Sequence, residues 1–196
     1  MAIVRREAIL TICALVLGGI RGSYAAQATA DADLWMADLL DTRALVNPLR
    51  FSRFADPIYF LISPIGWRPN SGQTNYLPVT VPIGFVTDLT SIPRVFWSAL
   101  RPDGDYAYAA IVHDFLYWEQ ARPREEADVI FKLAMEDLDV RPEVVALIYE
   151  AVHRFGDEAW ESNARLKKGG ERRILVKVPD DPTVRWNDWK KRPDVF

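Results

Sequence analysis

Two helical patterns that follow one another across a single proline constrain this 196-residue chain more than any other feature. The first, "DYAYAAIVHDFLYWEQA", places Ala109, Val112 and Leu116 at helical spacing behind Asp105, which suits an N-cap. Pro123 opens the second, "PREEADVIFKLAMEDLDV", whose acidic first turn complements the helix dipole. The short connection between them predicts that the two helices pack antiparallel.

A third helical pattern and a strand-rich region complete the predicted core. The third helix is expected from Pro142 to about Phe155, and Gly156 is expected to end or loosen it. Upstream, "PIYFLISPIGW" and "YLPVTVPIGFVTDL" are typical of short strands, with turns around residues 70–73. The sequence therefore predicts an α+β fold, in which a small antiparallel sheet or a set of hairpins packs on a bundle of about three helices.

Residues 1–25 have the pattern of a secretory signal peptide. Arg5 and Arg6 precede the apolar run "AILTICALVLGGI", and small residues follow it, with cleavage expected after Ala25. The run is shorter than the roughly 20 residues that span a bilayer; an uncleaved membrane anchor is the alternative. We therefore expect an exported, periplasmic or secreted protein, with an N-terminal helical segment over residues 26–54.

Charge and cysteine content limit the partners and the stabilising devices of the chain. There are 24 Lys and Arg against 27 Asp and Glu, a balance that offers no general surface for a phosphate backbone and argues against nucleic acid. The single cysteine, Cys13, lies in the expected signal peptide, so the exported part must be stabilised by its core alone. The oligomeric state is left open.

The expected domain covers residues 55–160, and a polar C-terminal extension follows over residues 161–196. One strand is predicted within the extension, over residues 174–178. Trp186 and Trp189 are suited either to an ordered wrap that docks on the domain or to an arm that docks on a partner.

The stretch "IVHDFLYWEQ" places one of the two histidines of the chain next to a carboxylate. On a helix, His113 and Tyr117 share a face, and Asp114 is turned about 100° aside. Asp128 lies beside the apolar stripe of the following helix, so antiparallel packing brings it near His113 and Tyr117. A carboxylate on one ring nitrogen orients an imidazole as a general base, which makes these three residues the candidate catalytic group.

The strings "HDFLY" and "DVIF" on two antiparallel helices resemble the active-site pair of phospholipase A2 enzymes, particularly the bacterial and parvoviral forms. The resemblance covers about residues 103–135. It implies that His113 activates a water, that Asp128 and Tyr117 support the histidine, and that Asp114 binds a calcium ion which polarises the ester carbonyl of a membrane lipid. The glycine-rich and cysteine-rich calcium loop of the secreted enzymes is missing here.

The segment "RPDGD" lies where such a calcium loop would lead into the helix. Asp103 and Asp105 are therefore candidate calcium ligands beside Asp114. A turn followed by a helix cap explains the same two residues and is the simpler interpretation.

A longer resemblance rests on "VPIGFVTDLTSIPRVFW", "AAIVHDFLYW", "ADVIFKLAM" and "YEAVHRFGDEAW". Together they resemble an uncharacterised domain family, common in phages, prophages and bacterial genomes, that is known only as a domain of unknown function. In the first string, Asp88, Ser91 and Arg94 are candidates for lining a pocket. Asp88 and Ser91 are equally suited to capping a turn or a short helix. Asp88 and Arg94 are also suited to forming a buried ion pair. Gly84 suits a tight backbone.

Two functions from different classes follow from these residues. The first is an exported hydrolase of the phospholipase A2 type, with His113 as general base and a membrane lipid as substrate. The second is a non-enzymatic phage-derived or envelope-associated protein, in which His113, Asp114 and Asp128 form a buried polar network between two helices. His153, with only Asp157 and Glu158 as acidic neighbours in sequence, is expected at the surface or at a helix end.

Overall fold

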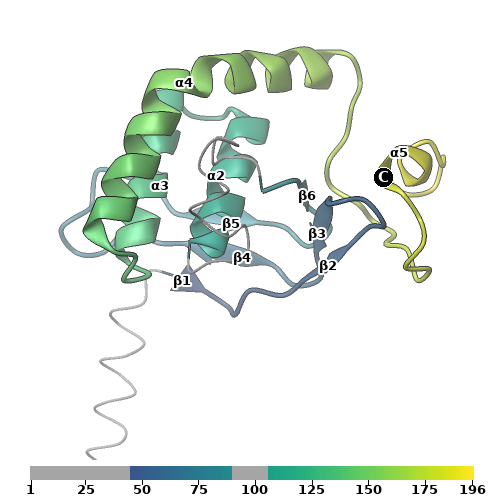
Figure 1. Ribbon diagram of the computed structural model, residues 1–196, viewed down its shortest axis with the longest axis horizontal. Helices are drawn as coiled ribbons and strands as arrows, with labels where there is room; N and C mark the ends of the chain where they lie inside the picture. Colours follow the sequence, from purple (N-terminus) through teal and green to yellow (C-terminus); the bar gives the residue numbers. More distant parts are fainter. Residues whose placement is uncertain (1–44, 90–105) are drawn as a thin grey trace, which may run out of the picture. The chain divides into compact units, whose positions relative to one another are not determined.

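The computed structural model describes residues 45–89 and 106–196. Ala44–Phe196 form one compact unit, separate from Met1–Arg43. Within the two described ranges, the chain forms six short strands and four helices, three of them long, so the fold is α+β as predicted (Figure 1). None of the described helices combines the length and the apolar content needed to cross a membrane.

The six strands pair into two antiparallel sheets of three strands each. In chain order they are β1 (Leu45–Val46), β2 (Phe51–Arg53), β3 (Tyr59–Leu61), β4 (Ile65–Trp67), β5 (Val79–Val81) and β6 (Val86–Thr87). The strand orders are β1-β4-β5 and β2-β3-β6. Between β4 and β5, the Gln73 amide donates to the Asn70 carbonyl at 2.8 Å, which confirms the predicted turn.

The segment expected to be helical over residues 26–54 contains strands in its described part. Residues 26–44 lie outside the described ranges, but β1 and β2 fall within residues 45–54. Leu45 pairs with Trp67 of β4, and Phe51 pairs with Leu61 of β3. The helical expectation is therefore wrong for residues 45–54, because pairing with strands further along the chain determines their conformation, and sequence periodicity does not detect such pairing.

Three long helices follow the strands, and a single helical turn lies near the C-terminus. They are α2 (Ala107–Glu119), α3 (Arg124–Glu136), α4 (Pro142–Lys168) and α5 (Trp186–Trp189). Pro123 directly precedes α3, as predicted. At the start of α2, Tyr106 occupies the N-cap position and makes no side-chain cap. The predicted cap, Asp105, lies outside the described residues.

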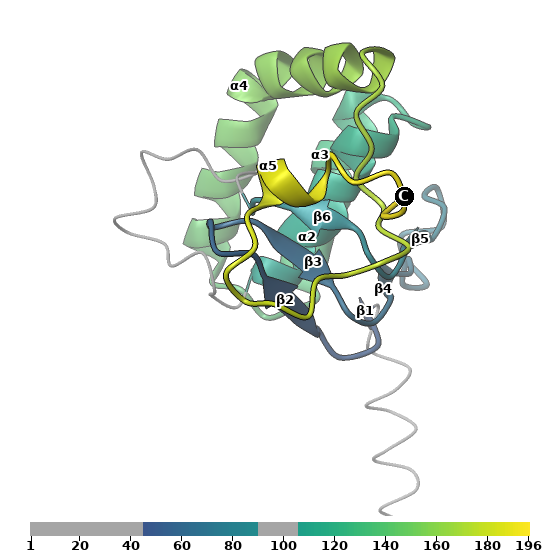
Figure 2. The ribbon, with the colours of Figure 1, turned by 90° about the vertical axis from the view of Figure 1, so that its right-hand side faces the viewer.

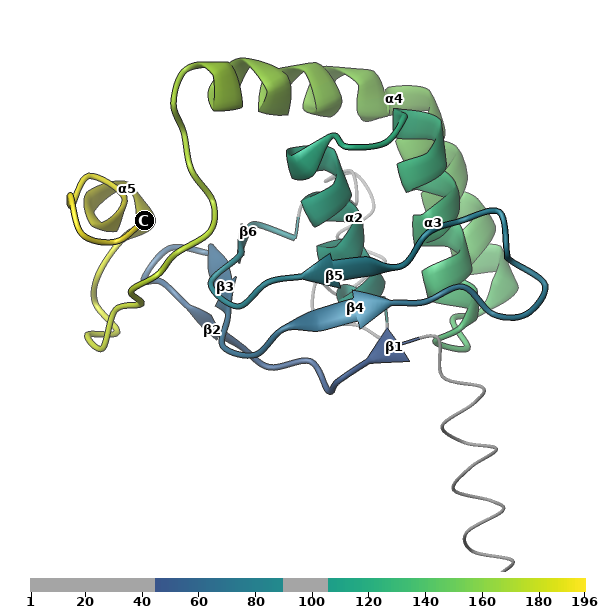
Figure 3. The same cartoon turned by 180° about the vertical axis from the view of Figure 1, so that it is seen from behind.

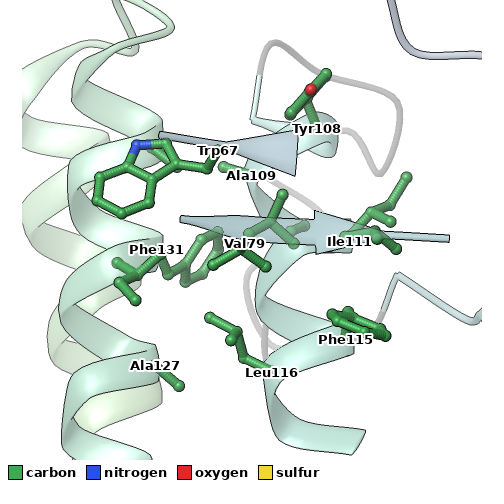
Figure 4. Close-up of a cluster of buried hydrophobic side chains, with 14 of the residues drawn as sticks. Trp67, Val79, Tyr108, Ala109, Ile111, Phe115, Leu116, Ala127 and Phe131 are labelled. Carbon is green, nitrogen blue, oxygen red and sulfur yellow. The ribbon is translucent and has the colours of Figure 1, made fainter. Parts of the chain in front are cut away.

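Helix α2 is the centre of the larger core. Eleven of its 13 residues are buried, because its sequence is apolar on nearly every face and alanines allow neighbours to approach closely. Strands β4 and β5 lie against one side of it, in front of α2 in Figure 3, while α3 runs antiparallel beside it (Figure 4). The Tyr108 hydroxyl accepts from the Gly66 amide at 3.0 Å and joins α2 to β4.

Helix α4 continues through Gly156 instead of ending there, and so runs across the expected domain boundary at residue 160. It bends near its middle (Figure 1). It ends at Lys168, and a Schellman motif follows. Gly170 has a φ of 88°, its amide donates to the Lys167 carbonyl, and the Glu171 amide donates to the Leu166 carbonyl. Gly156 lies inside this helix at a position where the Tyr117 hydroxyl leaves no room for a Cβ.

The C-terminal extension is an ordered wrap on the second sheet (Figure 2). Trp186 and Trp189 are buried in a second core with Phe54, Phe60 and Val86. The predicted strand over residues 174–178 is reduced to one bridge, between Ile174 and Phe85. Gly84, at φ 81°, faces the Leu175 carbonyl so closely that any Cβ would overlap it, which confirms the tight backbone expected there.

Candidate functional site

Helices α2 and α3 bring the predicted histidine, tyrosine and aspartate together. His113 Nε2 lies 3.0 Å from Asp128 Oδ1, and the Tyr117 hydroxyl donates to the same oxygen at 2.6 Å. His113 and Tyr117 are one helical turn apart, with ring centroids separated by 4.1 Å. The antiparallel packing of the two helices therefore makes the contact that the i, i+4 spacing predicted.

Asp128 has two further partners that the sequence analysis did not assign. Arg124 Nη1 donates to Asp128 Oδ2 at 2.8 Å, and His153 Nδ1 lies 3.7 Å from that oxygen. His153 is 45% exposed, so it lies at the surface as expected, but its acidic neighbour is Asp128 on another helix. Both histidines of the chain thus contact one buried carboxylate.

These partners keep Asp128 ionised although it is fully buried. Burial opposes ionisation, but hydrogen bonds from His113 and Tyr117, together with the charge of Arg124, lower the pKa of the Asp128 carboxyl. The same contacts raise the pKa of the Tyr117 hydroxyl, because burial and the adjacent carboxylate both disfavour a phenolate. Tyr117 is therefore a hydrogen-bond donor at neutral pH.

His113 is neutral in this environment. Burial lowers its pKa, and the hydrogen bond and charge of Asp128 offset that effect only in part. An ionised Asp128 can only accept, so the Nε2 atom must carry the ring proton and Nδ1 must carry the lone pair. Among the described residues, none hydrogen-bonds to the buried Nδ1 atom. A neutral imidazole with a free Nδ1 has the state that a general base requires.

The ring of His113 is closed to bulk solvent. Its exposed fraction is 1%, and it stacks on Phe131 at a centroid distance of 4.5 Å. Asp128 is 0% exposed. Water reaches Nδ1 only if the packing around the ring opens, which is the main structural requirement that a catalytic role for this histidine must meet.

Gly156 of α4 is required by the packing of Tyr117. A Cβ at this position would overlap the Tyr117 hydroxyl and lie 3.1 Å from Arg124 Nη1. Arg124 also bonds through Nε to Asp157 Oδ1 at 2.9 Å. The middle of α4 therefore packs over the Tyr117–Asp128 hydrogen bond. This close packing explains why a glycine occurs in the interior of the helix, where the sequence had suggested a helix end.

Asp114 projects from α2 into a different environment from His113. It is partly buried, and the Thr87 hydroxyl at the end of β6 donates to its Oδ2 atom. A cavity of about 200 Å³ lies beside it, and Asp88, Tyr117 and Arg173 are among the residues that line this space. His113 and Asp114 thus have different partners, as their 100° offset on the helix predicted, and Tyr117 lies between the two environments because it bonds to Asp128 and also lines this cavity.

The described residues do not by themselves make a calcium site. Calcium takes six to eight oxygen ligands, whereas Asp88 and Asp114 are the two carboxylates that line the cavity and Arg173 adds a positive charge to it. Within residues 45–89 and 106–196, no group of three or more acidic, histidine or cysteine side chains is placed to hold a metal ion. The other two predicted ligands, Asp103 and Asp105, lie outside the described residues.

The predicted pocket group is described only in part. Asp88 lines the cavity beside Asp114, while Ser91 and Arg94 lie outside the described ranges. Two further residues of the site carry a signal in the sequence. Arg124 precedes Asp128 by four positions, the spacing of a helical ion pair, and Gly156 sits inside an otherwise regular helical pattern, where a close packing contact is a common reason for glycine.

Comparison with known proteins gives a family match over part of the chain. No curated protein and no solved structure was found to match the chain. Over residues 69–152, the chain matches the model of a family described as "Protein of unknown function (DUF1353)". The candidate residues of α2 and α3 fall inside this segment, whereas His153 and the C-terminal extension follow it.

Proposed function

We propose that the chain is a hydrolase in which His113 acts as general base toward a water molecule. The observation that carries this proposal is the state of the imidazole. Its Nε2 atom is bound to an ionised Asp128, and its Nδ1 atom has no hydrogen-bond partner among the described residues. A purely structural histidine would be expected to satisfy both ring nitrogens, because an unpaired buried polar atom is destabilising.

The proposed reaction is attack of water on an ester carbonyl. Nδ1 takes a proton from the water as its oxygen bonds to the carbonyl carbon. The tetrahedral intermediate then breaks its bond to the leaving oxygen, which receives the proton from the imidazolium, so the products are a carboxylic acid and an alcohol. Asp128 stabilises the imidazolium, and Tyr117 and Arg124 hold the carboxylate in position.

The nature of the substrate and of the electrophile rests on the phospholipase A2 resemblance. It makes a membrane lipid ester the first substrate to test. If the protein is not an enzyme, an envelope component is the expected partner instead. It also assigns calcium to Asp114, Asp103 and Asp105. Calcium, export and the phage association stay predictions, and the catalytic part of the proposal does not depend on them.

The second candidate function is a non-enzymatic envelope or phage-derived protein in which a buried polar network fastens helices together. Of the three residues expected in that network, His113 and Asp128 are in contact, whereas Asp114 accepts from Thr87. The burial of His113 favours it, because the structural role needs no opening of the packing. In that case Asp128 serves as a common anchor for α2, α3 and α4 through Tyr117, Arg124 and His153. The two functions differ in what a substitution of His113 should change.

The decisive experiment measures hydrolysis and stability on the same samples. Fatty acid release is followed from mixed phospholipid vesicles, with calcium and with a chelator. For the hydrolase, His113→Gln and Asp128→Asn should each lower the rate of hydrolysis at least about 100-fold. The control is Asp139→Asn, which replaces an exposed carboxylate shortly after α3 and should leave the rate unchanged. Loss of activity with chelator would support the calcium prediction, and unchanged activity would remove it without affecting the role of His113.

The opposite outcome is equally clear. If folded protein releases no fatty acid from vesicles of neutral and anionic phospholipids, and His113→Gln lowers the free energy of unfolding by about 1 to 3 kcal/mol, the structural role stands and the hydrolase proposal is abandoned.

A further inference from the structure

A cavity in the described part of the chain lies away from His113, between the end of α4 and the last residues of the C-terminal extension. Its volume is about 720 Å³, which is in the range of sites that bind small organic molecules. Figure 1 shows α5 and the C-terminus beside the chain that descends from the end of α4. All of its lining residues follow residue 152, so it lies outside the segment matched by the family model.

The cavity is strongly basic although the chain as a whole has a net charge of −3. Five cationic side chains and one carboxylate line it: Arg165, Arg172, Lys190, Lys191, Arg192 and Glu171. They come from the last turn of α4, the turn that follows it, and the segment after α5. Cations gathered from three separate segments around one space repel one another, and an anion bound between them would relieve that repulsion.

The carboxylates near these cations do not neutralise the cavity. Lys190 pairs with Glu171 at 3.1 Å, and Lys191 lies 3.9 Å from Asp188, where both side chains are largely exposed. Arg165 pairs with Glu161 at 3.4 Å, but both side chains are about two-thirds exposed, and such surface pairs are weak. Arg172 makes no ion pair or side-chain hydrogen bond within the described ranges, and the Arg192 guanidinium lies over the Trp189 ring at 4.3 Å.

We propose that this cavity binds an organic phosphate. Three of its cations are arginines, whose planar guanidinium groups donate two parallel hydrogen bonds to a phosphate. Leu166, Pro193 and Phe196 add apolar surface for the organic part of the ligand. The volume is more than an inorganic ion would fill, which favours a phosphate ester, either free in solution or as the headgroup of a phospholipid.

The cavity adjoins the candidate active site without being part of it. Ser162 and Leu166 line both this cavity and the smaller one beside Asp114 and Tyr117. A ligand held by the arginines would therefore lie next to the smaller cavity, which Asp114 and Tyr117 of α2 help to line. The binding itself needs no chemistry at His113, so it can be tested without turnover.

The test uses the full chain and two probes, glycerol 3-phosphate in solution and vesicles of phosphatidylglycerol, with phosphatidylcholine vesicles as the neutral comparison. Binding is measured by calorimetry for the soluble probe and by co-sedimentation for the vesicles. Saturable binding of glycerol 3-phosphate identifies a soluble ester as sufficient. Binding to phosphatidylglycerol vesicles alone identifies a lipid headgroup. Both outcomes support the phosphate site.

A matched pair of variants ties the binding to the cavity. Arg165→Gln with Arg172→Gln should weaken binding at least about tenfold, because two charge-assisted contacts are lost. Arg141→Gln with Arg154→Gln removes the same charge from exposed positions outside the cavity, and Arg154 also pairs with a glutamate one helical turn away. This control should change the affinity by less than about twofold, since distant exposed charges are screened by salt.

Arg165→Lys with Arg172→Lys keeps the charge and should give an intermediate loss, which separates lost phosphate contacts from a misfolded extension. The proposal is overturned if neither probe binds saturably, or if both glutamine variants weaken binding equally.

Discussion

Asp128 illustrates what a single buried carboxylate demands of its neighbours. Its two oxygens are shared by His113, Tyr117, Arg124 and, at longer range, His153. Removing Arg124 takes away the one close donor to Oδ2, whereas Oδ1 keeps one donor when either His113 or Tyr117 is removed. The sequence spacing identified two of these partners, but the convergence of three helices on one side chain is visible only in the folded chain.

Gly156→Ala tests this arrangement at one atom. In an ordinary helix interior, alanine is more stabilising than glycine by about 1 kcal/mol. Here the new methyl group would overlap the Tyr117 hydroxyl, so we expect a loss of about 1 to 3 kcal/mol in the free energy of unfolding. Urea denaturation measures the change.

Gly72→Ala, at an exposed turn with open space around the Cβ, is the control and should be nearly neutral. A Gly156→Ala variant as stable as the parent chain would contradict the packing role of this glycine.

The buried imidazole also makes stability depend on pH. Burial lowers the pKa of His113 from 6.5, so the unfolded chain binds this proton more readily than the folded chain. Stability from this group is present above pH 6.5 and declines as the pH falls from there toward the lowered folded pKa. The slope should approach about 1.4 kcal/mol per pH unit.

Denaturant unfolding of the parent chain and of His113→Gln between pH 7.5 and 5 measures this effect. Groups that do not contact His113 titrate alike in both proteins, so the difference between their curves reports His113 together with its partner Asp128. Parallel curves would mean that His113 titrates normally and that its ring is not buried as described.

At the scale of elements, β3 to β6, the first two long helices and the first part of α4 follow from local pattern, whereas β1, β2, the second half of α4 and the extension do not. Short apolar runs broken by prolines predicted β3 to β6, and the N-terminal acidic turn after Pro123 predicted α3. The predicted end of the third helix at Gly156 was wrong, because a glycine that makes room for a neighbour has the same sequence appearance as one that ends a helix.

The C-terminal extension gives a prediction at this scale. Trp186 is 7% exposed, and its ring lies 5.5 Å from the Phe54 ring, measured between centroids. Its backbone amide donates a hydrogen bond to the Asp56 carboxylate. Trp186→Ala should lower the free energy of unfolding by about 3 to 5 kcal/mol. Val176→Ala, which alters a side chain that is 77% exposed, should change it by less than about 0.5 kcal/mol.

Equilibrium unfolding followed by tryptophan fluorescence checks both variants. Equal stability of Trp186→Ala and Val176→Ala would show that the extension is not part of the cooperative core.

For the molecule as a whole, the described unit carries two cores that share the β2-β3-β6 sheet. Phe60 belongs to the smaller core and Leu61, its neighbour in β3, belongs to the larger one, so alternate residues of one strand face different sides. Gly84 and Leu175 join the extension to the chain that leads into β6. The cores should therefore unfold together.

A fragment of residues 44–196 tests this prediction. We expect it to fold without residues 1–43, with one thermal transition at the same midpoint by circular dichroism and by tryptophan fluorescence. Two separate transitions would show that the cores are independent, and an unfolded fragment would show that residues 1–43 are needed for folding.

The sequence by itself determined the helix pair and the meeting of His113, Tyr117 and Asp128, because helical periodicity and a short connection fix which residues share a face. Only the tertiary structure decided that the ring is buried, that Arg124 and His153 join Asp128, and that the extension closes over the second sheet. Those features depend on contacts between residues far apart in the chain, and a local sequence pattern does not predict which distant segments contact one another.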